Sequence, residues 1–240
     1  MHVDEGTSED WRKLAGFHYR SHRIAAPRKI FCLKRGEELC GVIVYCYPPP
    51  TCFGRRRVLP KMSMKELNKK LSIITRVVVH PKYRTIGLGV KLVWETLAKA
   101  GTPYVEMPAV MTKYNPFGEK AGMQKIAEQP PPKEALKIAE ILQQLSFNIQ
   151  LLGSEKYVLN KLQTLSDEDL EKVREAFIKH CHTRFMKYFF PHLPFGHKKD
   201  YVEEIKKASL ERLARLIKVC GFLLQTKVYL FWSKLEIHKQ

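Results

Sequence analysis

An arginine and two glycines form the pattern Arg84-x-x-Gly87-x-Gly89. The pattern lies between two apolar segments that differ in the spacing of their apolar residues. The β-branched run from Ile73 to Val79 predicts a strand, and the apolar spacing after Gly89 predicts a helix. A helix N-terminus favours an anion, because unpaired N–H groups and the positive end of the helix dipole meet there. Glycine adds positive φ and a close approach of the backbone. The pattern therefore predicts a phosphate-binding turn, to which Arg84 adds a fork of donors.

The standard nucleotide-binding patterns are absent from the chain. It contains no Gly-x-Gly-x-x-Gly and no Gly-Lys followed by Ser or Thr, which argues against a dinucleotide site or a P-loop. Glycine pairs also occur where a strand turns into a helix in unrelated α/β proteins. The first motif alone is therefore compatible with an ordinary turn, and a second motif is needed to identify a ligand.

The turn resembles the acetyl-CoA pyrophosphate loop of the GNAT N-acetyltransferase family, whose pattern is Gln/Arg-x-x-Gly-x-Gly/Ala. The preceding VVVHPKYR resembles the end of that family's fourth strand. A second segment, Asn115-Pro-Phe117-Gly-Glu-Lys-Ala-Gly122-Met123, is similar to the family's Asn-x-x-(x)-Phe-Tyr-Glu-Lys-x-Gly-Phe. The two signatures follow in the family's order and spacing. The resemblance covers residues 24–129 and a last strand, so that half of the chain lies outside it.

The resemblance implies an α/β (α+β) fold with a mixed, mostly antiparallel central sheet and helices on both faces. Its strands are expected at 29–34, 39–47, 73–79, 104–111, 124–127 and 225–232, and the family's usual first strand is not found. A first helix is expected at 8–20, capped by Ser8, and a short helix at 63–71, where Ser63 and Glu66 form a capping box.

Three prolines at 130–132 mark a change of composition, after which the sequence is helical at 135–145, 154–162, 166–182 and 199–219. An aromatic-rich break is expected at 185–194. We expect a GNAT acyl-CoA-binding domain from residues 1–129 and 222–240. An α-helical accessory domain is inserted at residues 130–221.

Acetyl-CoA is the cofactor that the resemblance implies. In the family, the arm of the cofactor lies between strands four and five, and the glycine turn binds its pyrophosphate. A strand-four amide polarises the acetyl carbonyl. The residues expected to bind it are Val77, Val78, Val79, Arg84, Thr85, Ile86, Gly87, Leu88, Gly89, Val90, Asn115 and Phe117.

The sequence gives a weaker signal for the residues that transfer protons than for those that bind the cofactor. The tyrosine with which the family often protonates the leaving thiolate falls on Gly118, and Tyr114 is the nearest substitute. Glu106 is the first candidate for the base, because a carboxylate in an apolar strand has a raised pKa. The structural alternatives stay open: Glu106 facing solvent and Tyr114 serving only in packing.

The charge of the chain is uneven. The 240 residues have a net charge of +18, and residues 1–129 hold 23 Lys and Arg against 11 Asp and Glu. The densest basic segment, expected to bind nucleic acid, consists of Arg55, Arg56, Arg57, Lys61, Lys65, Lys69 and Lys70. This charge predicts an anionic partner, of which RNA such as tRNA is the preferred class. The alternative is a solvated basic surface.

The cysteines and the apolar stretches of the chain bear on metal binding and on localisation. The six cysteines form no CxxC pair and fit no common zinc spacing, so we expect free thiols and no metal. No apolar stretch has the length of a membrane span, and no signal peptide begins the chain. We therefore expect a cytoplasmic protein with no membrane partner. The sequence leaves the oligomeric state open.

Three functions follow from these observations. The first is an acetyl-CoA-dependent N-acetyltransferase whose acceptor amine belongs to RNA or to a nucleic-acid-associated protein. The second is a GNAT-fold nucleic-acid-binding module with weak or no catalysis, which Gly118 favours. The third is a small-molecule acetyltransferase, for which the charge is incidental. The chain also resembles the acetyltransferase-like region that accompanies ABC-type ATPases in some archaeal and phage proteins, which names such an ATPase as a partner to test.

Overall fold

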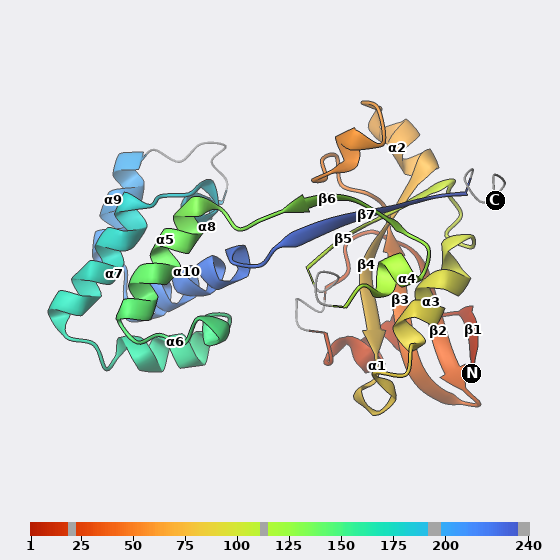
Figure 1. Cartoon of the computed structure of the whole chain (residues 1–240), viewed down its shortest axis with the longest axis horizontal. Coiled ribbons are helices and arrows are strands. Elements are labelled where there is room, and N and C mark those ends of the chain that lie inside the picture. Colours follow the sequence, from red (N-terminus) through yellow and green to blue (C-terminus); the bar gives the residue numbers. More distant parts are fainter. Residues whose placement is uncertain (19–22, 111–114, 192–197, 235–240) are drawn as a thin grey trace. The chain divides into compact units, whose positions relative to one another are not determined.

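The computed structural model describes residues 1–18, 23–110, 115–191 and 198–234. The candidate Tyr114 lies outside the described residues. The chain divides into two compact units, a sheet unit of residues 1–129 with 227–240 and a helical unit of residues 130–226 (Figure 1).

A seven-stranded sheet forms the centre of the sheet unit, in the order β1-β2-β3-β4-β5-β7-β6. The strands are β1 (His2–Glu5), β2 (Pro27–Arg35), β3 (Glu38–Cys46), β4 (Leu71–Val79), β5 (Tyr104–Ala109), β6 (Gln124–Gln129) and β7 (Lys227–Ser233). Neighbours are antiparallel except for β4 and β5, which are parallel. The predicted mixed, mostly antiparallel sheet is confirmed.

The absence of a first strand was a wrong expectation. Residues His2–Glu5 form β1, which pairs antiparallel with β2. This segment is polar, and Val3 is its one partly buried residue. Its backbone pairing, rather than an apolar face, makes it a strand, so hydrophobic periodicity gives no signal for it.

Helices cover both faces of the sheet. On one face, α3 (Leu88–Leu97) and α4 (Phe117–Lys120) pack on a core that includes Ile74 and Met107. On the other face, α1 (Ser8–Ala15) buries Trp11 and Leu14, and α2 (Met64–Lys70) buries Leu67. A short 3₁₀ turn, η1 (Arg55–Arg57), precedes α2, and another, η2 (Pro81–Tyr83), follows β4.

The helix caps are partly those expected from the sequence. Ser63 and Glu66 form the predicted capping box at the start of α2. At α1 the cap is Thr7 rather than Ser8, because Thr7 is extended and its hydroxyl accepts from the amides of Glu9 and Asp10. This helix ends at Ala15, earlier than expected.

The helical unit consists of α5 (Lys133–Gln144), η4 (Ile149–Leu151), α6 (Glu155–Leu162), α7 (Asp167–Lys179), α8 (Thr183–Phe189), α9 (Lys198–Lys207) and α10 (Leu210–Leu223). Two expectations were wrong here. The aromatic stretch forms α8, with Phe185 fully buried, and the expected helix at 199–219 is two helices because Ser209 caps α10. Within the residues described, every helix falls short of the length and apolarity that a bilayer crossing requires.

Candidate functional site

The two parallel strands at the centre of the sheet separate toward their carboxyl ends. Leu71, Ser72 and Ile73 pair with Tyr104, Val105 and Glu106, and the β4–β5 ladder stops there. Beyond this point β4 stays paired with β3 as far as Val79, and β5 stays paired with β7 as far as Ala109. A wedge therefore opens between the two strands.

A β-bulge lies where β4 leaves β5. Val44 pairs with Arg76 and Tyr45 pairs with Ile74, so Thr75 is the extra residue on β4. The Thr75 hydroxyl contacts the Cys46 thiol at 3.1 Å. A bulge bends its strand and increases the local twist, which accounts for the departure of β4 from β5 at this residue.

A cavity of about 100 Å³ occupies the start of the wedge. Its walls come from β4 (Thr75 and Val77), from β5 (Met107) and from α4 (Phe117). His18, which follows α1, completes the lining on the face of the sheet that α1 covers. The lining therefore combines apolar side chains with an imidazole ring.

The turn before α3 has the geometry of an anion site. Thr85 and Gly87 have positive φ, 72° and 85°, and Gly87 is the N-cap of α3 without a side-chain cap. The amides of the first turn of α3 have no acceptor within the helix. A Cβ built on Gly87 or Gly89 would meet nothing within 4 Å, so the space above the turn is open. The Arg84 guanidinium donates to the Val79 carbonyl at 3.1 Å and stays exposed.

The turn and the cavity lie at the same edge of the sheet. The strands β4 and β5 are parallel, so their carboxyl ends point the same way. The turn follows β4 after a single 3₁₀ turn, and the cavity lies between the middle of β4 and the last residues of β5. The carboxyl edge of parallel strands is where open α/β sheets bind ligands.

The structure brings the predicted cofactor residues to this edge in two groups. Val77 and Phe117 line the cavity, while residues 84–90 form the turn and the start of α3. Val78 points to the opposite face and packs with Trp11. Asn115 is exposed just before α4. The predicted base Glu106 belongs to neither group.

Glu106 is locked in a buried ion pair, so the expected general base was a wrong prediction. Its carboxylate accepts from Arg55 Nε at 2.9 Å and from Arg55 Nη2 at 2.6 Å, and Tyr229 donates to it at 2.8 Å. Neither charged side chain is more than 6% exposed. The apolar strand suggested an unpaired carboxylate, but the segment before α2 folds over β5 and supplies its partner.

Two neighbours of this pair stay neutral. Burial, followed by the Glu106 charge, raises the pKa of the Tyr229 hydroxyl, so Tyr229 remains a donor. Burial also raises the pKa of the Cys52 thiol to about 12. The Tyr229 ring packs so closely on Gly54 that a Cβ there would lie 2.5 Å from it. We define Arg55, Glu106, Tyr229 and Cys52 as the anchor cluster.

Arg55 is therefore not available to nucleic acid, which corrects one predicted residue of the basic segment. The guanidinium also donates to the carbonyl of Pro49 at 2.8 Å. The other six cations of the segment are exposed: Arg56, Arg57, Lys61, Lys65, Lys69 and Lys70. Among the described residues, no carboxylate lies within ion-pair distance of any of the six. We call these six residues the basic segment.

A side chain at Gly118 would meet the ends of two neighbouring side chains, which would have to move to make room for it. A Cβ built there would lie 2.5 Å from Leu230 Cδ1 and 2.5 Å from Met107 Cε. The residue is buried. As a glycine, this residue has no side chain that could supply an acid.

His18 and Tyr229 are the residues that sequence reasoning missed. His18 is separated by more than fifty residues from the strand beside which it lies, and Tyr229 reads as one more aromatic residue of an apolar strand. Neither has a local signal, because their surroundings come from elements far away in the sequence.

Comparisons with known proteins give structural likenesses only. No family model matches the chain, and no curated protein sequence matches it either. A Bacillus subtilis acetyltransferase solved with CoA is 17% identical, with a TM-score of 0.40, over 54% of this chain and 80% of its own. The Escherichia coli ribosomal-protein-S18-alanine N-acetyltransferase is 11% identical, with a TM-score of 0.36, over 55% and 85%.

A third similar structure is Rv2747 of Mycobacterium tuberculosis, solved with CoA and NLQ. It is 13% identical, with a TM-score of 0.35, over 75% of this chain and 92% of its own. At these identities and TM-scores the likeness carries no argument about what this chain does.

Proposed function

We propose that this chain is an N-acetyltransferase of the GNAT type, which transfers an acetyl group from acetyl-CoA directly to an amine. The observation that carries the proposal is the open glycine turn at the start of α3 beside the wedge between β4 and β5. An unpaired strand edge next to an anion site fits a ligand with an amide-containing arm and a diphosphate. CoA has both.

The residues present fit this donor. The first-turn amides of α3 and the open space above Gly87 and Gly89 suit a diphosphate, and the exposed Arg84 adds positive charge. The edge of β4 from Thr75 to Val79 offers backbone groups to the arm, as a partner strand would. When bound, acetyl-CoA supplies the activated acyl group.

The chain's own residues position the reaction and exclude water. Met107, Phe117 and Val77 give the cavity an apolar wall, beside which electrostatic interactions at the reacting atoms are strengthened. A backbone N–H of β4 that points into the wedge suits a developing oxyanion. Holding donor and acceptor together supplies much of the rate.

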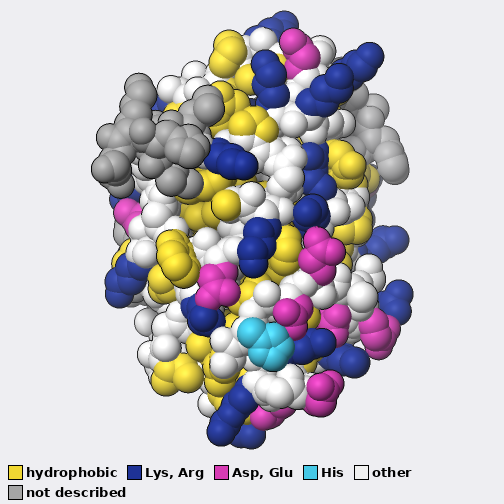
Figure 2. All heavy atoms as spheres, turned by 90° about the vertical axis from the view of Figure 1, so that its right-hand side faces the viewer, with side chains coloured by type: hydrophobic (Ala, Val, Ile, Leu, Met, Phe, Trp, Pro, Cys, Tyr) yellow, Lys and Arg dark blue, Asp and Glu magenta, His cyan; other side chains and the backbone are white. Residues whose placement is uncertain are grey.

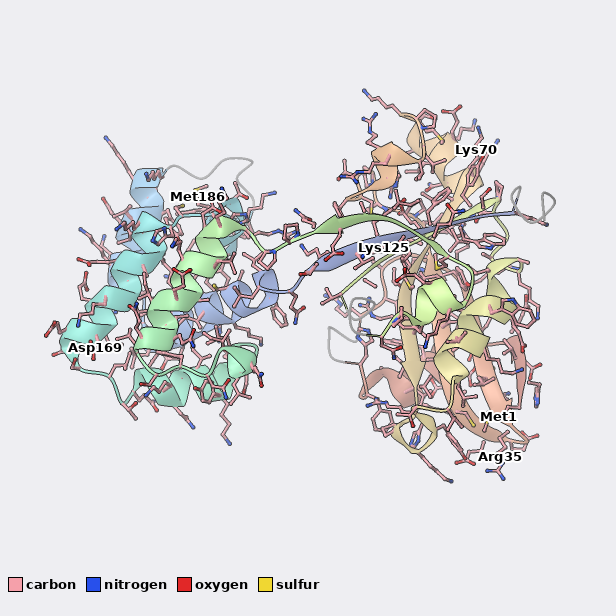
Figure 3. The ribbon with its side chains drawn as sticks, viewed as in Figure 1. Met1, Arg35, Lys70, Lys125, Asp169 and Met186 are labelled. Atoms are coloured by element: carbon pink, nitrogen blue, oxygen red, sulfur yellow. The ribbon has the colours of Figure 1, made fainter. Side chains whose placement is uncertain are left out.

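The acceptor in this proposal is an amine on an anionic macromolecule, with RNA such as tRNA as the first choice. The six exposed cations of the basic segment support it, together with the net charge of +18. Figure 2 shows Lys and Arg side chains projecting at the top of this face, the end at which α2 lies in Figure 1. Lys70, labelled in Figure 3, is the last residue of α2.

The backbone of the basic segment is held in place, while its six cationic side chains are exposed. The anchor cluster ties its start to β5 and β7, and the capping box orders α2. Leu59 and Leu67 are buried beneath it. A surface ordered in advance loses less conformational entropy when a polyanion binds, which favours a binding role over an incidental loop.

Calorimetry with acetyl-CoA tests the donor. Wild type should bind, and Gly89→Glu should lose binding because it places a carboxylate against the diphosphate. Gly153→Glu is the matched control: it adds the same charge in the helical unit, where a Cβ also meets nothing within 4 Å. No heat with wild type would exclude the enzyme, and equal affinity of the Gly89→Glu variant would show that the turn is misassigned.

Transfer of radiolabelled acetyl groups tests the acceptor. Unfractionated tRNA, total protein and a polyamine mixture are offered separately, and label in the tRNA fraction is expected. Label confined to protein or polyamines would overturn the choice of RNA while leaving the donor intact. An ABC-type ATPase partner stays a prediction, which co-purification with such a protein would test.

The second candidate function is a protein with the same fold that binds nucleic acid and has weak or no catalytic activity. Gly118 stands where the resemblance implies a tyrosine, and Glu106 is held in the anchor cluster, which supports this second function. A nucleic-acid-binding module with weak or no catalysis would bind tRNA with a steep salt dependence and transfer no label to any fraction.

A further inference from the structure

The proposed reaction requires a group that removes a proton from the acceptor. An amine attacks only as a neutral nitrogen, and it carries an extra proton once it is bonded to the acyl carbon. Glu106 cannot take that proton, because Arg55 engages both of its oxygens and Tyr229 donates to one of them. The base must therefore come from another residue beside the wedge.

The residues that line the cavity limit which side chain can act as the general base. The residues from β5 and α4 that line it carry no ionisable side chain. Of the described residues in the lining, those that carry ionisable groups are Arg76 of β4 and His18. A guanidinium stays protonated in proteins and cannot act as a base. An imidazole, with an ordinary pKa of about 6.5, can accept a proton near neutral pH.

His18 is held at the cavity by ordered neighbours. Its backbone N–H donates to the Ala15 carbonyl at 3.0 Å, in the turn that ends α1. Its ring lies edge-on to Trp11, with 6.0 Å between ring centroids, and Trp11 is only 3% exposed. The imidazole therefore stands on the side of the sheet opposite α3, across the wedge from the helix whose N-terminus forms the anion site.

Arg76 is the charged neighbour, and its guanidinium is engaged. It donates to the Thr75 carbonyl at 2.8 Å and to the Arg23 carbonyl at 3.1 Å, and it lies 5.9 Å from the centre of the Trp11 ring. A fixed positive charge beside the cavity attracts a substrate phosphate, which suits an acceptor on RNA.

We infer that His18 is the general base of the acetyl transfer, an inference that rests on the proposed function. The amine nitrogen forms a bond to the acyl carbon of the thioester, and the carbon–sulfur bond breaks. The imidazole of His18 takes the proton that the nitrogen loses. The sulfur leaves with the bonding electron pair as a thiolate, which takes up one proton from solvent, and His18 later returns its own proton to solvent.

Proton NMR of the histidine rings tests whether His18 lies beside the bound CoA, and it does not require catalytic turnover. The C2–H resonance of His18 is assigned by its absence from His18→Gln, and unreactive CoA is then added. The His18 resonance should shift, while that of His2, an exposed residue of β1, should not. If calorimetry shows that CoA binds and the His18 resonance stays in place, His18 does not lie at the reaction site.

Kinetics test the role. Release of thiol from acetyl-CoA is followed with tRNA and, separately, with poly-L-lysine as acceptor. His18→Gln should lower kcat about 10²- to 10⁴-fold, the usual contribution of a general base, and leave the acetyl-CoA Kd within twofold by calorimetry. His2→Gln, the control, should match wild type. The fall in wild-type kcat at acidic pH, near a histidine pKa, should be absent from His18→Gln.

These experiments distinguish a failure of the proposed function from a failure of the inference about His18. No binding of acetyl-CoA by wild type overturns the proposed function and this inference together. Normal binding and turnover with an unchanged kcat in His18→Gln overturns the inference alone. If neither acceptor supports turnover, the choice of acceptor fails, and the NMR shift of His18 still decides whether its ring lies at the site.

Discussion

Arg55→Met should be one of the most destabilising single changes in the sheet unit. The substitution removes two hydrogen bonds, of 2.9 and 2.6 Å, from a carboxylate that is fully buried. Tyr229 remains as a donor at 2.8 Å, so Glu106 keeps one partner but loses its counter-charge. Removing one member of a buried ion pair costs about 3–5 kcal/mol, because the other charge is left uncompensated. In a unit of this size that corresponds to a fall in Tm of roughly 10 °C.

Urea unfolding followed by tryptophan fluorescence isolates this effect. The three tryptophans, Trp11, Trp94 and Trp232, all lie in the sheet unit, so the signal does not report on the helical unit. Arg56→Met is the matched control, since it removes the same charge from an exposed neighbour. The control should change the free energy of unfolding by no more than about 0.5 kcal/mol.

A double variant separates the charge from the packing. Arg55→Met combined with Glu106→Gln leaves no uncompensated charge, so it should be more stable than Arg55→Met alone. If Arg55→Met unfolds at the same urea concentration as Arg56→Met, the buried pair does not exist as described. Glu106 would then return as a candidate base.

Three further variants test other parts of the structure. Gly118→Ala should cost about 1–3 kcal/mol through overpacking against Leu230 and Met107, and an unchanged urea midpoint would mean that α4 packs elsewhere. Thr7→Ala should cost about 0.5–2 kcal/mol by removing the cap of α1, whereas a Ser8→Ala change of equal size would reassign the cap. Glu155 accepts from Arg215 and Lys218, which lower its pKa, so its stabilising effect is present above the ordinary glutamate pKa and is lost as pH falls through the lowered value. The difference between wild type and Glu155→Gln in far-UV circular dichroism melts should therefore be present at pH 7 and vanish below about pH 4, and a difference that persists in acid would contradict this ion pair.

Periodic and capped segments could be predicted from the sequence. The capping box at Ser63 and the strand at 71–79 follow from residues within a few positions of one another. The split between α9 and α10 was missed although Ser209 is a good cap, because the apolar spacing continues across it. The strand β1 was missed because its stability comes from pairing with β2 and not from its own residues.

The candidate site divides in the same way. The sequence alone determined the anion turn, since its geometry depends on Gly87 as N-cap and on the strand and helix on either side of it. Tertiary structure decided which titratable groups lie beside the wedge. Arg55 meets Glu106 across 51 positions, and His18 reaches the wedge from the other side of the sheet. Strand register and the folding of distant segments set such contacts, so a carboxylate that reads as a free base in the sequence is an anchor in the fold.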